Sequence, residues 1–170
     1  KQNGGVVQTV AFKSYLNTEK YDARNDALKT IREKVTDSLG LKWYEWSEFR
    51  ALTDSVQMEF LANRKKIIDL SNEKVNSIPD FPPAVNVSDF IDHIDYLVEK
   101  IGIEHVGISS DFDGGGGIEG WNDASETFNI TLELVRRGYT EEDISMLWSG
   151  NLLRVLDEVE AVAKELQAAE

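Results

Sequence analysis

Carboxylates and glycines come together in one segment of the sequence that could do chemistry. Asp111 and Asp113 follow a short apolar run, and four glycines, Gly114–Gly117, come directly after them. Glycine lets the backbone adopt positive φ and approach a ligand closely, so this run is not there to fill a core. A carboxylate beside such a loop can bind a cationic group or transfer a proton. The structural alternative is a loop in which both carboxylates only cap backbone amides.

Two known motifs match the letters of this segment but not its context. Gly115–Gly120 has the pattern G-x-G-x-x-G, yet no helix is expected to open there, and the nearby carboxylates would repel a pyrophosphate. Asp111 and Asp113 also begin like a calcium loop. That loop needs an oxygen ligand where Gly115 stands and a bidentate glutamate where Asn122 stands. We therefore expect neither a dinucleotide nor calcium here.

The two histidines are not spaced as metal ligands. His93 lies in a helical pattern, whereas His105 begins an expected strand at the end opposite Asp111. Histidines on two different elements make no ligand-spacing pattern. Asp92 and Asp95 do not converge with His93, because residues one or two apart on a helix do not face each other. We expect both histidines to be structural.

The element that positions Asp111 is the second half of a β/α unit. Apolar residues at helical spacing predict a helix over 89–101, with Ser88 as N-cap and Gly102 as its stop. The run 105–110 then reads as a short buried strand, so Asp111 stands at its carboxyl end. Functional residues of β/α barrels cluster at that end of the strands.

The remaining pattern predicts one more strand and much helix. The strand covers 5–12, helices are expected over 18–39 and 46–75, and residues 17–77 form a helical excursion between the two strands. Prolines in 78–83 predict an extended linker inside one domain. Thr140 opens a capping-box pattern, and further helices are expected over about 127–138, 141–147 and 151–167.

Two strands are too few for a stable sheet beside so much helix. The order of elements therefore fits the last two units and the C-terminal helices of a larger, helix-rich (β/α)₈ TIM-like barrel. On this interpretation residues 1–170 are a single partial domain of an α/β protein.

Composition excludes some classes of function. The chain has 170 residues with a formal net charge of −13, which repels nucleic acid and anionic lipid. It has no cysteine, so disulfides and thiolate metal sites are excluded. No apolar run approaches the length of a membrane span. The abrupt start at Lys1, without an initiator methionine, is expected of a piece of a longer protein, and the compartment is not indicated.

Several segments resemble the membrane (renal) dipeptidases, a family of zinc metallopeptidases. Those segments are Asp92–Tyr96, His105–Gly114, Gly120–Asp123, Leu134–Tyr139 and Trp148–Val155, and Gly4–Val7 resembles the preceding strand of the same barrel. The likeness is specific over residues 89–160 and loose over the helical excursion.

The resemblance implies a barrel of the metal-dependent hydrolase type with two zinc ions, hydrolysing dipeptides and related small amides. Asp111 matches the family's aspartate after the last strand, which is implied to contact the amino end of the substrate and to take part in proton transfer. Asp113 is given a supporting role in holding the loop. The family's metal ligands have no matching position in this sequence, so the chain alone is expected to lack a competent zinc site and to be inactive.

Two other functions remain open at this stage. One is a different metal-dependent amidohydrolase on a similar barrel. The other is a non-catalytic interaction domain whose acidic helices bind a partner, and the helical excursion is also the candidate surface for a homodimer. For a dipeptidase or another amidohydrolase, the expected ligand is a dipeptide or a related small amide. No nucleic acid is expected as a partner.

Overall fold

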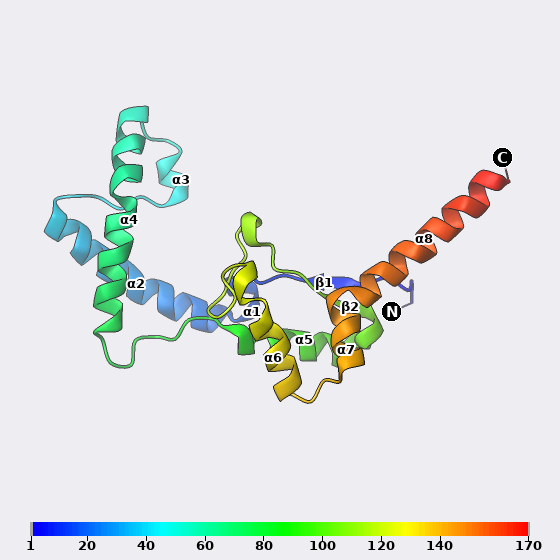
Figure 1. The fold of residues 1–170 in the computed structure, drawn as a ribbon. Coiled ribbons are helices and arrows are strands. Elements are labelled where there is room, and N and C mark those ends of the chain that lie inside the picture. Colours follow the sequence, from blue (N-terminus) through cyan, green and yellow to red (C-terminus); the bar gives the residue numbers. More distant parts are fainter. Residues whose placement is uncertain (1, 170) are drawn as a thin grey trace. The chain divides into compact units, whose positions relative to one another are not determined.

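The structure, a computed structural model, describes residues 2–169 and is a helix-rich α/β chain (Figure 1). Its contacts separate into two compact units. Unit 1 contains the residues up to Thr18 and from Ala84 onward, and unit 2 contains Glu19–Pro83. The second boundary falls at the end of the proline-containing linker predicted from the sequence. That residues 1–170 form one partial domain stays a prediction.

Unit 1 is built on two parallel strands. β1 (Val7–Thr9) pairs with β2 (Val106–Ile108), with Val7 opposite Val106 and Thr9 opposite Ile108. Thr9 Oγ1 donates a hydrogen bond to the carbonyl of Gly107 at 2.9 Å. This side-chain bond adds to the backbone pairing in fixing the register of the two strands. Both expected strands are confirmed, and both are shorter than predicted. The parallel pairing brings the carboxyl ends of β1 and β2 to the same edge.

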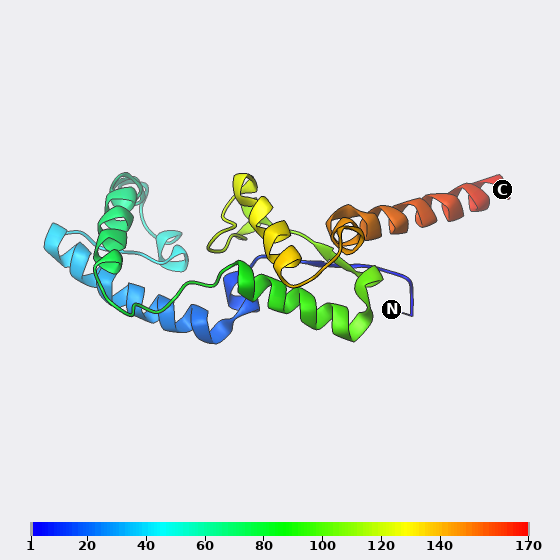
Figure 2. The ribbon, with the colours of Figure 1, turned by 60° about the horizontal axis from the view of Figure 1, so that its bottom comes forward.

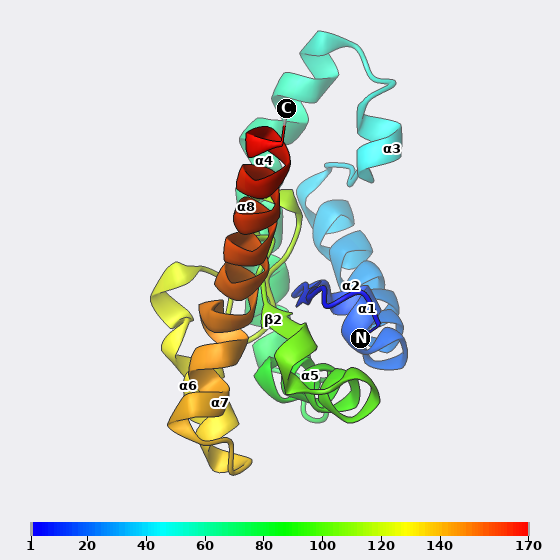
Figure 3. The same ribbon diagram turned by 90° about the vertical axis from the view of Figure 1, so that its right-hand side faces the viewer.

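Helices of unit 1 cover this pair. α5 (Val87–Ile101) contacts β2 and α6 (Phe128–Arg136), as Figure 3 shows for α5 and β2. α1 (Lys13–Leu16) and the 3₁₀ turn η1 (Ile103–His105) also contact α5. The buried apolar side chains of this unit come from the sheet, these helices and the loop after β2: Ala11, Val85, Phe90, Ile91, Ile94, Val106, Ile108, Ile118, Trp121, Ile130, Leu134, Ile144 and Leu147.

The N-cap of α5 is Asn86, so the prediction of Ser88 was wrong. The Asn86 side chain accepts hydrogen bonds from the amides of Ser88 and Asp89, and the Asp89 carboxylate accepts from the Asn86 amide at 2.8 Å. This reciprocal arrangement is a capping box that starts two residues earlier than expected. Asn, Ser and Asp are nearly equivalent as N-caps, so propensity alone could not choose between the two positions. Gly102 ends α5 with φ of 89°, as predicted.

The C-terminal helices begin with a second capping box. Thr140 and Asp143 cap α7 (Glu141–Ser145) reciprocally, which confirms the sequence prediction. α7 continues through a π-helical turn, η4 (Met146–Gly150), into α8 (Asn151–Ala168). The amide group of Asn151 donates to the carbonyls of Ile103 and Val106 at 2.7 and 2.8 Å, so the start of α8 is fastened to β2.

Beyond its first turns α8 extends away from the rest of unit 1 (Figures 1 and 2). Its apolar residues recur at helical spacing but are exposed, with fractions from 48% to 66%. They form a stripe on one helix: Leu152, Leu153, Leu156, Val159, Val162 and Leu166. Nothing in the described part of the chain covers this stripe.

Unit 2 contains α2 from Glu19 onward (α2 spans Thr18–Leu39), α3 (Trp46–Phe49) and α4 (Asp54–Asn76). The prediction of one continuous helix over 46–75 was wrong, because Thr53 takes an extended conformation and starts α4 as its N-cap. The Gln57 side chain donates to the carbonyls of Phe49 and Leu52 at 3.1 Å, which satisfies acceptors freed at the break. The core of unit 2 is Ile31, Val35, Ile67 and Val75 with the partly buried Leu28, Leu39, Leu41, Trp43, Leu70 and Phe81.

The aromatic residues between the helices of unit 2 pack against α4. Trp43 and Tyr44 both meet Phe60 of α4 edge to face, and the Arg32 guanidinium of α2 lies over the Trp43 ring. Arg24 donates to the carbonyl of Pro82 at 2.5 Å, so the two ends of unit 2 are joined. No helix of residues 2–169 is long and apolar enough to cross a membrane.

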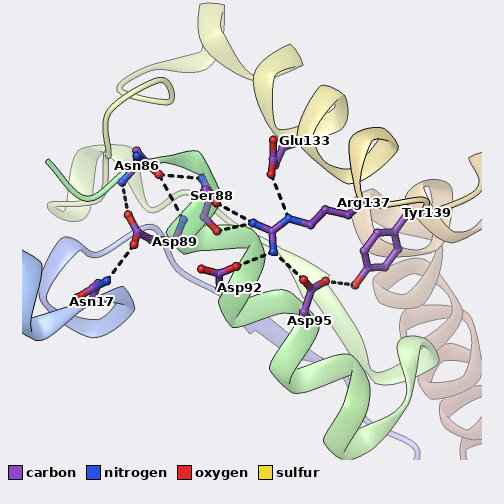
Figure 4. A network of polar contacts seen from close by, with 9 residues as sticks. All are labelled: Asn17, Asn86, Ser88, Asp89, Asp92, Asp95, Glu133, Arg137 and Tyr139. Atoms are coloured by element: carbon purple, nitrogen blue, oxygen red, sulfur yellow. Dashed lines mark hydrogen bonds and ion pairs between the residues drawn. The ribbon is translucent and has the colours of Figure 1, made fainter. Parts of the chain in front are cut away.

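A polar network centred on Arg137 joins α5 to α6 (Figure 4). One guanidinium nitrogen lies 2.6 Å from Asp92 and 2.7 Å from Asp95, both on α5. Another donates to the carbonyl and hydroxyl of Ser88, each at 2.9 Å, and Nε donates to Glu133 on α6 at 3.1 Å. A planar guanidinium suits such multidentate binding, which an ammonium could not reproduce.

Tyr139 extends this network, since its hydroxyl donates to Asp95 (Figure 4). Partial burial opposes the charge on Arg137, but the hydrogen bonds that it donates to Asp92, Asp95 and Glu133 outweigh burial and raise the pKa of Arg137. Burial of the phenol, together with its bond to Asp95, also raises the pKa of Tyr139. The network therefore requires a charged guanidinium and a neutral phenol.

We predict that Arg137→Lys lowers the free energy of unfolding by about 1.5–3 kcal/mol, since several charge-assisted hydrogen bonds are lost at a mostly buried side chain. Arg136→Lys is the matched control, because the neighbouring Arg136 is 66% exposed and makes only a 3.6 Å contact with Glu133. We expect that control to stay within about 0.5 kcal/mol of the wild type. Urea unfolding measures both, and equal effects would contradict the importance given to Arg137.

We predict a pH-dependent contribution from Tyr139. Its pKa is raised in the folded state, so its contribution is fully present below the unfolded value of about 10 and is lost as pH rises toward the folded value. The stability difference between wild type and Tyr139→Phe should be constant up to about pH 9 and shrink above about pH 10. Urea unfolding at a series of pH values tests this, and parallel profiles of the two proteins across that range would refute it.

Candidate functional site

Asp111 stands just beyond β2 in a left-handed backbone conformation, with φ of 55° and ψ of 40°. Few residues other than glycine adopt this region, and aspartate is among those that tolerate it best. The Asp111 carbonyl accepts hydrogen bonds from the amides of Gly114 at 3.1 Å and Gly116 at 2.7 Å. The chain therefore curls around the backbone of the residue that sequence analysis singled out. This curl contains the 3₁₀ turn η2 (Phe112–Gly114).

The glycines make this curl possible. A Cβ on Gly116 would overlap the carbonyl oxygen of Ser110 and lie 2.7 Å from that of Asp111. A Cβ on Gly114 would overlap the Asp111 carboxylate. Gly115 has φ of 117° and lies against the Phe12 ring. The expected positive φ is found at Gly115 and Gly117. The close approach seen at Gly114 and Gly116 is to the protein itself, and approach to a ligand stays a prediction.

The loop is tied to the carboxyl end of β1. The amide of Gly117 donates to the carbonyl of Ala11 at 3.0 Å. Phe12, next in the chain, caps α1, and its ring stacks on Tyr15 with centroids 5.2 Å apart. One edge of the parallel pair therefore carries Asp111, the glycine loop and two aromatic rings.

The carboxylates of Asp111 and Asp113 are exposed. Among residues 2–169, neither accepts a side-chain hydrogen bond or forms an ion pair, so both are available to a ligand. The 3₁₀ turn η2 begins directly after Asp111, so the two carboxylates do not continue the extended geometry of β2. The loop itself is held by backbone hydrogen bonds, and a supporting role for Asp113 stays a prediction.

Beyond the glycines, the loop is fastened to the start of α5. Ile118 and Trp121 exchange two backbone hydrogen bonds of 3.1 and 3.0 Å. Glu119 donates from its amide to the carbonyl of Val85 at 2.9 Å and accepts from the amide of Val87 at 3.2 Å. The segment then continues into the short turn η3 (Ala124–Glu126), where hydrogen bonds from Ser125 lower the pKa of Asp123.

The histidines lie apart from this loop. His105 Nδ1 lies 2.8 Å from the carbonyl of Gly5, at the amino end of the strand pair, and His93 lies on α5. No group of three or more His, Cys, Asp or Glu side chains within residues 2–169 is arranged to hold a metal ion. The contact of His105 with the β1 segment fits the structural role expected of it.

Sequence reasoning did not single out Phe12, Tyr15 or Trp121. Trp121 is 2% exposed, and its ring meets Phe112 at 5.3 Å between centroids. Trp121 belongs to the segment Gly120–Asp123 that resembles the family, and it is a large apolar residue within a polar, glycine-rich stretch, but neither signal predicted its packing. Phe12 and Tyr15 gave no signal, because their relation to Asp111 comes from strand pairing across about a hundred residues.

Comparison with known proteins places the chain in a family. The sequence model of the membrane dipeptidase family (peptidase family M19) matches residues 1–170. This chain therefore belongs to the membrane dipeptidase family, as the resemblance of its motifs predicted.

The relatives are all named as dipeptidases, and each is longer than this chain. Dipeptidase ataJ of Aspergillus terreus is 39% identical over 121 residues, which are 70% of this chain and 29% of that protein. Dipeptidase aclJ of Aspergillus oryzae is 43% identical over 84 residues, 49% of this chain and 20% of that protein. The crystal structure of the probable dipeptidase PvdM from Pseudomonas aeruginosa matches with a TM-score of 0.51 and 34% identity, covering 90% of this chain and 36% of that one. The chain thus spans about a third or less of each of these relatives.

We predict that Gly116→Ala destabilises unit 1 by about 1–3 kcal/mol, since a new methyl group must displace the backbone of Ser110 or Asp111. Gly5→Ala is the matched control. Gly5 likewise has no positive φ, and the nearest atom to its Cβ, at 3.3 Å, belongs to the flexible side chain of Asn3. Urea unfolding followed by tryptophan fluorescence compares them. An equal or smaller loss for Gly116→Ala would mean that the loop relaxes without cost.

Proposed function

We propose that this chain is part of a zinc-dependent dipeptidase that hydrolyses dipeptides and related small amides, with Asp111 as its substrate-side carboxylate. One observation carries the proposal. In a chain of the membrane dipeptidase family, an exposed and unpaired aspartate lies at the carboxyl edge of parallel strands, on a loop whose curl requires glycine. Functional side chains of β/α proteins gather at that edge.

The chemistry proposed for Asp111 follows from its surroundings. Asp111 and Asp113 add negative charge to an edge where neither has a cationic partner among the described residues. Such an edge favours the ammonium group of a dipeptide over its carboxylate. A carboxyl group that binds this end of the substrate also lies near the scissile amide, because the substrate is short. It can then hold a proton and deliver it to the leaving amine.

We also propose that unit 1 completes a (β/α)₈ barrel. Two parallel strands alone do not make a stable sheet, and the outer edges of β1 and β2 have no strand partner in residues 2–169. Val7 of β1 is 46% exposed, and the apolar stripe of α8 is uncovered. Further strands and helices of a barrel would bury these surfaces.

The residues of this chain do not fit a zinc site, since no cluster of possible ligands occurs in residues 2–169. We propose that the zinc ions of the active enzyme are held by residues outside this sequence, and that residues 1–170 alone do not hydrolyse dipeptides. When bound, zinc supplies an activated hydroxide and polarises the substrate carbonyl. The contribution of this chain is to bind and orient the amino end of the substrate and to move a proton at the Asp111 carboxylate.

The test is Asp111→Asn in a full-length protein that contains this chain. We expect kcat/KM for dipeptides to fall by about 10²–10⁴, the usual contribution of a positioned acid–base group, while zinc content stays unchanged. Asp113→Asn is the matched control, with the same chemical change two residues away, and should have the smaller effect. A wild-type enzyme without dipeptidase activity, or an unchanged rate in Asp111→Asn, would disprove the proposal. Hydrolysis of other amides in preference to dipeptides would point to a different amidohydrolase.

A further inference from the structure

Trp121 is the buried centre of the loop that carries Asp111. It is 2% exposed, although the segment around it is polar and rich in glycine. Its ring meets Phe90 of α5 at 5.1 Å, Trp148 of η4 at 6.3 Å and Phe112 at 5.3 Å between centroids, all edge to face. One indole therefore joins two helical elements to the residue next to Asp111.

Polar contacts fix the orientation of this indole. Its Nε1 donates to the hydroxyl of Thr127 at 3.1 Å, and its backbone amide and carbonyl both pair with Ile118. A ring held at its polar end and packed at its edges cannot rotate without losing both kinds of contact. Trp121 is thus a rigid surface against which Phe112 packs.

The contact with Phe112 bears directly on Asp111. Phe112 is half-buried, whereas Asp111 and Asp113 on either side of it are exposed. Anchoring the ring of Phe112 fixes the direction in which the backbone leaves Asp111. A non-glycine residue keeps a left-handed conformation only where its surroundings determine it. Here those surroundings are the Phe112–Trp121 contact on one side and the amides of Gly114 and Gly116 on the Asp111 carbonyl on the other.

We propose that Trp121 is a positioning residue for Asp111: through Phe112 it holds the backbone of Asp111 in the left-handed conformation that presents the carboxylate to the substrate. The inference rests on the proposed function, since it concerns the same carboxylate. Trp121 touches no substrate itself. Its effect on the reaction should therefore vanish when Asp111 can no longer act.

The first test is a double-mutant cycle in a full-length protein that contains this chain. Trp121→Leu should lower kcat/KM about tenfold to a hundredfold, as small displacements of a reacting group do, with zinc content unchanged. In the Asp111→Asn background the same substitution should change the remaining rate less than about threefold. An equal loss in both backgrounds would overturn the proposal, because it would show a general structural effect.

Two further variants separate positioning from folding. Trp148→Phe disturbs the contact of the same indole with η4 and loses the bond of Trp148 to Thr131, while the ring contact between Trp121 and Phe112 is left in place. It should lower stability while changing kcat/KM less than about threefold. Phe112→Leu removes the half-buried ring that links Trp121 to Asp111, and it should reproduce the kinetic loss even if Trp121→Leu folds poorly. A fully active Phe112→Leu enzyme would overturn the proposal.

The second test does not depend on activity. The amide of Gly116 donates to the Asp111 carbonyl, so its hydrogen exchange reports whether the curl is intact. Phe112→Leu should accelerate that exchange at least about tenfold, whereas the amide of Gly102 at the end of α5 should be unaffected. Unchanged exchange at Gly116 would refute the positioning role. If the wild-type protein hydrolyses no dipeptide, the proposed function fails, and this exchange measurement alone decides whether the Phe112 anchor sets the geometry at Asp111.

Discussion

The parallel pairing of β1 with β2 is the constraint on which the rest of unit 1 depends. Its amino end is held by side chains that reach backbone carbonyls: His105 contacts Gly5, and Arg154 contacts Gly4 and Glu104. Because the strands run the same way, the segments that leave them meet at one edge, and the amide of Gly117 joins them there. A shift of one residue would turn every side chain of a strand to the opposite face. Only this register brings Asp111 to the same edge of the sheet as the stacked rings of Phe12 and Tyr15.

Polar and apolar contacts hold different parts of unit 1. The Arg137 network joins α5 to α6 through charged groups, which need ideal geometry to repay their desolvation. The ring of Trp121 packs against Phe90, Phe112 and Trp148, and its burial adds a non-directional contribution. The packing of α5 against α6 therefore depends on directional charged bonds, while the loop depends on backbone hydrogen bonds together with aromatic packing.

Local signals in the sequence were enough for most elements and for the place of Asp111 just beyond β2. Strands, glycine stops and the capping box at Thr140 were predicted because each depends on a few neighbouring residues. The break before α4 and the cap at Asn86 were not predicted. Each depends on which of several neighbouring, nearly equivalent polar residues becomes the N-cap of the helix. The left-handed backbone of Asp111 could not be predicted. The Phe112–Trp121 contact beside it and the hydrogen bonds from the amides of Gly114 and Gly116 to its carbonyl form only in the folded chain.

The insertion of unit 2 between the two strands has a consequence for the order of folding. Thr9 and Gly107 are 98 residues apart in sequence, and closing so long a loop costs conformational entropy that slows the pairing. The bond from Arg24 to the carbonyl of Pro82 brings the ends of the insertion together. Once unit 2 is folded, most of the loop is already closed, and each halving of the remaining length lowers its cost by about 0.6 kcal/mol. Helices that form locally would thus fold first and speed the formation of the sheet.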